Sequence, residues 1–203
     1  MGIVASSEGG SDYEPIPEGL HDAICYAVYD LGTQENTTWN KWQRKIVVVW
    51  ELTNQRIKIE RDGKELDLPR ATSKQYTLSL SDKAHLRNDL EMWRGKSFTN
   101  EELKGFDVSQ LVGKAAKLQI VHRQVNEKTY ANIKAIIPSG GGNHNTENEQ
   151  VVYEIGQPYD HLPKWVQEKV KQSREMMKPL IPENETEPDQ SFDDFGEGEE
   201  IPF

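Results

Sequence analysis

Hydrophobic residues between positions 21 and 80 follow the patterns of β-strands. Residues 21–32 (HDAICYAVYDLG) form an apolar run that predicts a strand ending at a bend at Gly32, and residues 41–54 (KWQRKIVVVWELTN) predict a longer strand. Residues 56–68 alternate in polarity around Asp-Gly, a dipeptide typical of a two-residue hairpin turn. Residues 73–80 predict a further strand. Both faces of the long strand become apolar by its middle, so we expect Trp50 in the core.

The hydrophobic period becomes helical after these strands. Residues 81–95 (SDKAHLRNDLEMWRG) place two leucines and a tryptophan at helical spacing, which predicts a helix capped by Ser81 and ended by the glycine. Residues 99–106 (TNEELKGF) begin with the Thr-x-x-Glu spacing of a capping box and predict a second, short helix. Residues 114–123 and 129–137 flank the polar stretch QVNEK and predict a final β-hairpin.

This order of strands, an inserted helix and a closing hairpin suits a mainly β fold, a five-stranded Greek-key barrel of the OB type. A C-terminal helix is predicted farther along, with Pro163 near its first turn. Its expected apolar side consists of Trp165, Val166, Val170 and Met177. The expected organisation is a disordered N-terminus (1–14), the barrel domain (15–138), a linker (139–161), the C-terminal helix (162–178) and a disordered acidic tail (179–203).

Charge is distributed unevenly along the chain. The net charge of −10, taken alone, argues against a nucleic-acid partner. Residues 41–138, however, carry 19 Lys and Arg against 12 acids, whereas residues 183–203 carry nine acids and no base. Acidic ends therefore mask a basic middle. No stretch approaches the roughly 20 apolar residues that span a bilayer, and no secretion signal is visible, so we expect a cytoplasmic protein without a membrane partner.

Sequence motifs for catalysis are missing. The chain contains neither a G-x-x-x-x-G-K-[ST] phosphate loop nor a G-x-S-x-G nucleophile motif, and its five histidines show no metal-binding spacing. The single cysteine, Cys25, excludes an internal disulfide and a multi-cysteine zinc site. We therefore expect no enzyme activity, no metal or cofactor and no small-molecule substrate.

The basic middle interleaves cations with aromatic residues, as do proteins that neutralise the phosphates and stack the bases of a single strand. In the predicted hairpin, alternation leaves one polar face, which carries Lys117, Gln119, Arg123, Tyr130, Asn132 and Lys134. The opposite face is apolar and carries Leu118, Ile120, Ala131, Ile133, Ala135 and Ile137. We assign nucleic-acid contacts to Lys117, Arg123, Tyr130 and Lys134. An ordinary solvated face is the alternative interpretation.

Two tryptophans offer a second candidate contact. Trp39 and Trp42 precede the buried part of the long strand, where a tryptophan has few packing partners, so we assign both a ligand role. Arg44 shares the face of Trp42, whereas Lys45 lies on the other face, and the sequence leaves open which face carries the ligand. The cations of the predicted helix 81–95 are better explained as a solvated face.

The sequence ends in DDFGEGEEIPF, where acidic residues lead to an apolar tip. This ending resembles the C-terminal tip of bacterial-type single-stranded DNA-binding proteins (SSBs), although Glu and Gly stand where Asp is commoner. The resemblance implies that the tip docks into basic, apolar-lined pockets on replication and recombination proteins, with the last phenylalanine filling the pocket. The residues assigned to partner binding are Asp193, Asp194, Phe195, Glu199, Glu200, Ile201, Pro202 and Phe203.

A second resemblance covers roughly residues 15–180. It is carried by residues 76–114 (YTLSLSDKAHLRNDLEMWRGKSFTNEELKGFDVSQLVGK), with AVYDLGTQ and VVVWELTN upstream. These stretches are similar to a family of phage-encoded proteins regarded as OB-fold SSBs. The resemblance implies a protein that coats single-stranded DNA with little sequence preference during phage replication and recombination, in the cytoplasm of the bacterial host. A protein-interaction adaptor or acidic DNA mimic is the rival, supported by the net charge. The sequence leaves open whether the chain forms a homo-oligomer.

Overall fold

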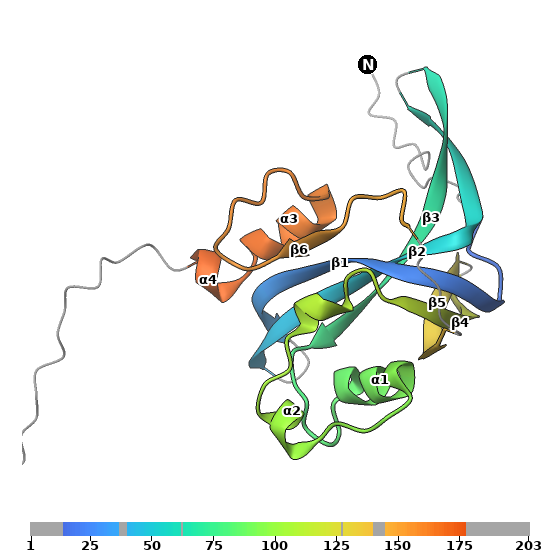
Figure 1. The fold of residues 1–203 in the computed structure, drawn as a ribbon. Coiled ribbons are helices and arrows are strands. Elements are labelled where there is room, and N and C mark those ends of the chain that lie inside the picture. Colours follow the sequence, from blue (N-terminus) through green and yellow to red (C-terminus); the bar gives the residue numbers. More distant parts are fainter. Residues whose placement is uncertain (1–13, 37–39, 62, 127, 140–144, 178–203) are drawn as a thin grey trace, which may run out of the picture.

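The fold is mainly β, as expected (Figure 1). The computed structural model describes residues 14–36, 40–61, 63–126, 128–139 and 145–177. A six-stranded sheet runs in the order β3-β2-β1-β4-β5 with antiparallel neighbours, and β6 pairs with β1 in parallel. The strands are β1 (Gly19–Asn36), β2 (Lys41–Arg61), β3 (Lys64–Thr77), β4 (Ala115–Val125), β5 (Lys128–Pro138) and β6 (Val151–Tyr153). The helices are α1 (His85–Arg94), α2 (Asn100–Lys104), the 3-10 helix η1 (Val108–Leu111), α3 (Lys164–Lys171) and α4 (Arg174–Met177).

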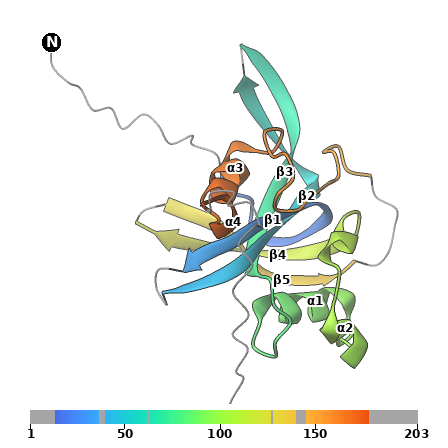
Figure 2. The ribbon, with the colours of Figure 1, turned by 90° about the vertical axis from the view of Figure 1, so that its left-hand side faces the viewer.

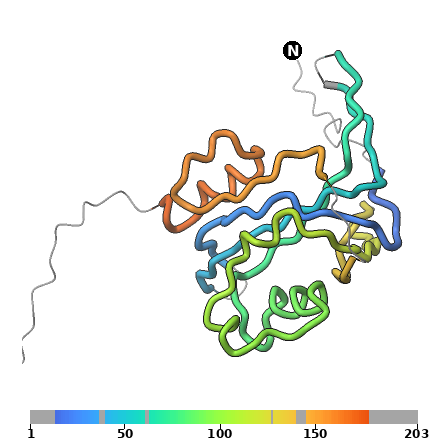
Figure 3. Tube along the Cα trace, viewed as in Figure 1, coloured from blue at the N-terminus to red at the C-terminus, as the bar shows by residue number. Residues whose placement is uncertain are grey.

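β1 is the central strand and lies between two layers. Figure 3 shows its blue trace between the orange C-terminal segment and the green segment that contains α1 and α2. On the side of α1, strand residues and helix residues form an inner cluster that includes Val48, Trp50, Leu90 and Trp93. On the side of α3, an outer cluster includes Tyr29, Val47, Val49, Val166 and Val170. Because both faces of the β1–β2 pair are covered, the middle of β2 is apolar at every position.

The sheet is open in the described part of the chain. β3 and β5 stand at the two ends of the strand order, and no pairing joins them among the described residues. The segment that precedes β1 lies near β3 and near the β4–β5 hairpin. Arg70 of β3 donates a hydrogen bond to the carbonyl of Glu14 (3.0 Å), and His122 Nε2 of β4 lies 2.8 Å from the carbonyl oxygen of Ile16. Ile16 also packs against the inner cluster.

Several local predictions are confirmed. β2 and β3 meet across the expected two-residue turn, since Arg61 pairs with Lys64. Thr99 and Glu102 form the expected reciprocal capping box of α2. β4 and β5 form the predicted hairpin, and Trp50 is a core residue with 1% of its surface exposed.

The first strand and the first helix differ from the predictions. β1 does not end at Gly32 but continues to Asn36, because a register shift between Asp30 and Thr33 absorbs the bend and Gly32 takes a left-handed φ of 68°. α1 begins at His85 rather than after Ser81. Its N-cap is Ala84, which offers no side-chain acceptor and donates its own amide to the carbonyl of Ser81 (2.8 Å) in a turn.

The C-terminal region is more closely integrated than the predicted linker and helix. The range 139–161 contains β6, which pairs with β1 and buries Tyr153. The single helix expected over 162–178 is two helices, α3 and α4, separated at Gln172–Ser173. Val166 and Val170 are buried as expected, but Trp165 and Met177 are 44% and 60% exposed. The helix breaks between these two side chains, and the Trp165 ring contacts Tyr29 in a T-shaped pair with ring centroids 6.2 Å apart.

Candidate nucleic-acid interface

The exposed face of the β4–β5 hairpin brings an aromatic ring and cations together. Arg123 lies directly opposite Tyr130, and directly opposed residues of an antiparallel pair share a face. The Tyr130 side chain is 49% exposed, which leaves its ring accessible to a stacking partner. Arg123, Lys128 and Lys134 are exposed and form no ion pair with another described residue. Three of the predicted contact residues, Arg123, Tyr130 and Lys134, therefore lie on one accessible surface.

The apolar face of this hairpin is partly different from the prediction. Ile133 is buried, but the next buried residue is Ile136, whereas Ala135 and Ile137 are only partly covered. The reason is a register shift, because Gln119 pairs with Ala135 while Ile120 pairs with Ile133. Lys134 is the extra residue of this bulge. The prediction assumed uninterrupted alternation, which the bulge breaks.

A groove of about 360 Å³ lies beside Tyr130. One wall is the segment Thr129–Ala131 of β5, and the other consists of Ile57 and Pro69–Ala71 from β2 and β3, with Glu14–Ile16 between them. The guanidinium of Arg70 borders this groove, and its hydrogen bonds go to the carbonyl oxygens of Glu14 and Arg56. A nucleobase stacked on Tyr130 would thus lie against apolar groups on one side and near cations on the other.

The second group of predicted contact residues, which includes Trp42, Arg44 and Lys45, lies at the start of β2. Trp42 is 42% exposed and pairs with Glu35 of β1. Arg44 forms an ion pair with Asp30 at 2.5 Å, and this hydrogen bond raises the pKa of Arg44. Because the carboxylate of Asp30 already balances this charge, Arg44 is a weaker candidate for a phosphate contact than Arg123. Trp39 lies outside the described residues.

Lys45 lies in a second hollow, which is polar and has no carboxylate among its described lining residues. Its Nζ donates hydrogen bonds to Gln43 Oε1 (3.1 Å) and Thr77 Oγ1 (2.7 Å), and partial burial lowers its pKa. The hollow measures about 390 Å³ and is also lined by Lys83 and His85. Its cations and hydroxyl groups suit an anion such as a phosphate group.

The two predicted groups lie at opposite ends of β1. Gly19, at the start of this strand, pairs with Ile120 of the hairpin, whereas Glu35, near its end, pairs with Trp42. At about 3.3 Å per residue, the sixteen steps from Gly19 to Glu35 span up to about 50 Å. The structure therefore does not gather all predicted contacts at one site.

Other predicted cations are engaged within the protein. Lys117 forms an ion pair with Asp22 at 2.8 Å. On α1, Arg87 pairs with Asp82 and Glu91, and the Arg94 guanidinium pairs with a glutamate of α2 while it stacks on an aromatic ring. The side chains of Arg87 and Arg94 are only 20% and 16% exposed, so these two cations are mostly covered and paired within the protein rather than on the solvated face that the sequence analysis expected.

Two residues of the hairpin surface and the groove escaped sequence reasoning. Lys128 has the same parity as Tyr130, so the alternation could have identified it had β5 been predicted to begin one residue earlier. Arg70 could not have been identified, because nothing local shows that β3 passes near the hairpin. The residues assigned to partner binding, Asp193, Asp194, Phe195, Glu199, Glu200, Ile201, Pro202 and Phe203, lie outside the described residues, as does nearly all of 1–14 and 179–203.

Other kinds of site find no support in the described ranges. Among those residues, no helix is long and apolar enough to cross a bilayer, and no group of three or more His, Cys, Asp or Glu side chains is arranged to hold a metal ion. Comparison of the chain with family models, with curated proteins and with solved structures finds no match.

Proposed function

We propose that this protein binds single-stranded DNA with little sequence preference. The observation that carries the proposal is the exposed ring of Tyr130 directly opposite Arg123, with Lys128 and Lys134 on the same hairpin and a groove beside them. A ring stacks on any base and a cation pairs with any phosphate, so this combination is tolerant of sequence. The basic balance of residues 41–138 supports the same conclusion.

The proposal includes a finer fold and a biological setting. The strand order β3-β2-β1-β4-β5, with a helix between β3 and β4, is compatible with an OB-type Greek-key barrel whose closing edge lies between β3 and β5. In this proposal the protein acts in phage replication and recombination within the bacterial cytoplasm. Its acidic residues 193–203 recruit partner proteins, the last phenylalanine entering an apolar pocket.

The experiment is a titration of fluorescently labelled oligo-dT with the full chain, followed by anisotropy at low and moderate salt. A duplex of equal length is the control ligand. We expect single strands alone to bind, with a log-log salt slope of about −0.7 per phosphate contact. Salt-independent binding would contradict an interface built on cations.

Substitutions at two similarly exposed aromatic residues test whether the β4–β5 hairpin is the binding site. Tyr130→Ala should weaken binding about five- to 150-fold, the equivalent of the ~1–3 kcal/mol that one stacked base contributes. Trp165→Ala removes a 44% exposed ring from α3, far along the chain from the hairpin, and should leave affinity unchanged. Equal loss in both variants would refute the assignment of the hairpin.

The rival function is an adaptor or DNA mimic that does not bind nucleic acid. No binding of oligo-dT by the full chain, persisting after removal of residues 193–203, would favour the adaptor. Binding that is kept or strengthened after this removal, together with lost partner recruitment, would favour the single-strand binder.

A further inference from the structure

A cavity of about 550 Å³ lies between the C-terminal end of α1 and the start of β4. Figure 2 shows α1 and α2 below β4 and β5, and the cavity is lined by residues from these elements and from η1. Its covered lining residues, Trp93, Phe106 and Leu111, are apolar, whereas Lys96 and Lys114 line it and are exposed. The volume falls within the roughly 300–1,000 Å³ that is usual for small-molecule sites. The cavity shares no lining residue with the groove beside the hairpin, so it is a separate candidate site.

The guanidinium of Arg94 is held in place at the border of this cavity. Its Cζ atom lies 4.3 Å from the centre of the Phe98 ring and 5.4 Å from that of the Phe106 ring. Nη2 donates a hydrogen bond to a carboxylate oxygen of Glu102, but Nη1 is buried and has no hydrogen-bond partner among the described residues. A buried donor without an acceptor is unfavourable. The guanidinium therefore retains donor capacity for an acceptor that a ligand brings.

The cavity carries more positive charge than the surrounding protein balances. Lys96 and Lys114 form no ion pair with another described residue. The only carboxylate among the described lining residues, that of Glu102, is already engaged. One of its oxygens accepts from Arg94, and the other accepts from the backbone N–H of Thr99 at 2.8 Å. A negatively charged acceptor is therefore the ligand group that complements this lining.

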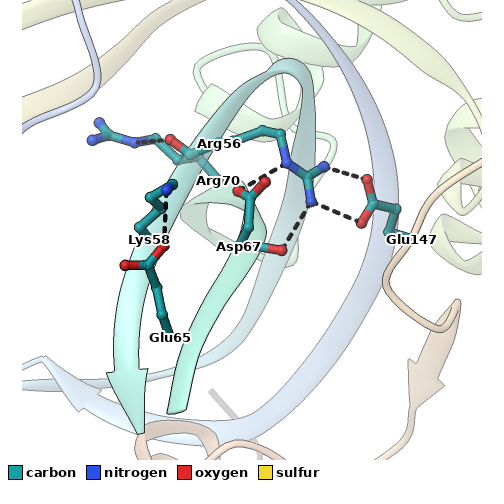
Figure 4. Close-up of polar contacts among 6 residues, drawn as sticks. All are labelled: Arg56, Lys58, Glu65, Asp67, Arg70 and Glu147. Carbon is teal, nitrogen blue, oxygen red and sulfur yellow. Dashed lines mark hydrogen bonds and ion pairs between the residues drawn. The ribbon is translucent and has the colours of Figure 1, made fainter.

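A second cluster of charged side chains, on the β2–β3 ribbon, is balanced within the protein (Figure 4). Arg56 pairs with Asp67 at 3.0 Å and with Glu147, which precedes β6, and Lys58 pairs with Glu65 at 2.8 Å. Each of these two cations has its own carboxylate partner, so this cluster is a weaker candidate for an anion. The cavity differs because only one of its three cations is paired with a described residue.

The apolar lining of the cavity is a poor match for a nucleobase. The Trp93 ring packs against Trp50, with ring centroids 5.8 Å apart, and its Nε1 donates to the carbonyl of Ala115 at 2.8 Å. Phe106 contacts Phe98 in a T-shaped pair with ring centroids 5.1 Å apart. These contacts occupy ring surfaces on which a base would stack, and a base would also bring polar edges against apolar side chains. An aliphatic or phenyl group brings no such edges.

We propose that this cavity binds a carboxylate that is carried on an apolar group. The apolar group packs on Trp93, Phe106 and Leu111, and the carboxylate faces the cations of the cavity. Two sources supply this chemistry, namely a free organic acid and the C-terminal residue of a polypeptide that ends in an apolar side chain. The inference goes beyond the proposed function and does not depend on it, because the cavity is separate from the proposed DNA interface.

Titration of the full chain with 4-phenylbutyrate, followed by ligand-observed NMR, tests the site. 4-Phenylbutanol, which has the same ring and chain but no charge, and acetate, which has the charge but no apolar group, are the control ligands. We expect 4-phenylbutyrate to bind about tenfold more tightly than either control, because only this ligand satisfies both the cations and the apolar lining. Equal affinity for 4-phenylbutyrate and 4-phenylbutanol would overturn the inference.

Matched lysine substitutions locate the binding. Lys96→Gln combined with Lys114→Gln removes the two unpaired charges, whereas Lys104→Gln removes an exposed lysine of α2 that pairs with Glu101 and does not line the cavity. The double variant should bind 4-phenylbutyrate about two- to thirtyfold more weakly, as expected for two exposed charge contacts. Lys104→Gln should leave the affinity unchanged. Equal affinity loss in the double variant and in Lys104→Gln, or displacement of 4-phenylbutyrate by oligo-dT, would overturn the assignment.

A second pair of ligands separates the two sources. N-acetyl-phenylalanine mimics the end of a polypeptide, and its amide lacks the carboxylate. Tighter binding of N-acetyl-phenylalanine than of 4-phenylbutyrate would support a polypeptide end as the ligand, whereas the reverse order would support a free acid. Binding of the amide as tightly as of N-acetyl-phenylalanine would refute a carboxylate site. Because none of these titrations requires DNA binding, their failure leaves the proposed function untouched.

Discussion

Replacing Gly32 with alanine tests how the C-terminal helices are held against the sheet. A Cβ atom at this position would lie 2.7 Å from Glu175 Oε2 and 2.8 Å from Ser173 Cβ. The carboxylate of Glu175 accepts hydrogen bonds from the backbone N–H of Thr33 (2.8 Å) and from its hydroxyl group (2.6 Å). The serine is fully buried, so it cannot move aside without disturbing the junction of α3 and α4.

The expected loss of stability has two parts. Alanine in the left-handed conformation, φ 68° here, costs about 1–2 kcal/mol relative to glycine. Displacement of Glu175 and the serine would remove one or both hydrogen bonds to Thr33, a further loss of about 1–3 kcal/mol. The free energy of unfolding should therefore fall by about 2–5 kcal/mol. Gly95→Ala is the matched control, because Gly95 has φ 67° but its nearest contact, a carbon of Pro138, is an ordinary 3.5 Å away. The control should lose only the conformational part.

The assay is urea-induced unfolding followed by tryptophan fluorescence and by circular dichroism in parallel. Coincident transitions for the two probes permit a two-state free energy for each variant. A decrease for Gly32→Ala at least about 1 kcal/mol larger than that for Gly95→Ala is expected. Equal decreases would mean that the missing side chain at Gly32 is not what allows α4 to pack against β1.

Three further predictions concern the buried side chains of Cys25 and Val166 and the carboxylate of Glu175. Cys25, with a pKa of about 12 caused by burial, should not react with a thiol reagent at pH 8 until urea unfolds the protein, as a time course with and without urea will show. Burial acts to raise the pKa of Glu175, but the hydrogen bonds from Thr33 outweigh it and lower the pKa. The stabilisation that ionised Glu175 gives to the folded protein is therefore complete above the ordinary pKa of a glutamate and is lost as the pH falls through its lowered pKa in the folded protein. Glu175→Gln removes this titration and should flatten the acid side of a plot of the free energy of unfolding against pH. Val166→Ala should lower the free energy of unfolding by about 1–3 kcal/mol because its side chain is fully buried, whereas exposed Trp165→Ala should lower it less, as urea titration will measure.

The elements that local sequence determines were predicted well. The Asp-Gly turn between Arg61 and Lys64 and the capping box of Thr99 and Glu102 depend on residues within four positions of each other. Trp50 could be assigned to the core because both faces of its strand are apolar. Ser81 was assigned as an N-cap from its type alone, and the turn that actually precedes His85 uses backbone groups that every residue possesses.

Features that depend on long-range contacts could not be read from the sequence. The bulge at Lys134 changes which residues of β5 face inward, yet the alternation of the sequence shows no break there. β6 pairs with β1 at Ala27–Tyr29, beyond Ile24, where the pairing of β1 with β4 stops, and nothing local in the sequence shows that β4 leaves this edge. The location of Trp42 relative to Tyr130 depends on the length of β1, which was predicted to end at Gly32 and in fact extends to Asn36.

The separation of the two predicted groups leads to a last prediction, about strand length. The outer cluster buries Val47 and Val49 beneath α3, so a single strand cannot lie on this part of the sheet. A strand that contacts both Tyr130 and Trp42 must therefore follow a path on the order of 50 Å, which is about 15 nucleotides at the 3.4 Å spacing of a duplex strand and fewer if the single strand is more extended. Tyr130→Ala should weaken binding to a six-nucleotide and a thirty-nucleotide oligo-dT alike, whereas Trp42→Ala should weaken only the longer one, as anisotropy titrations will measure. An equal loss on the short strand for Trp42→Ala would mean that the two side chains act at one site, which the pairing of β1 with β2 and β4 does not allow within one copy.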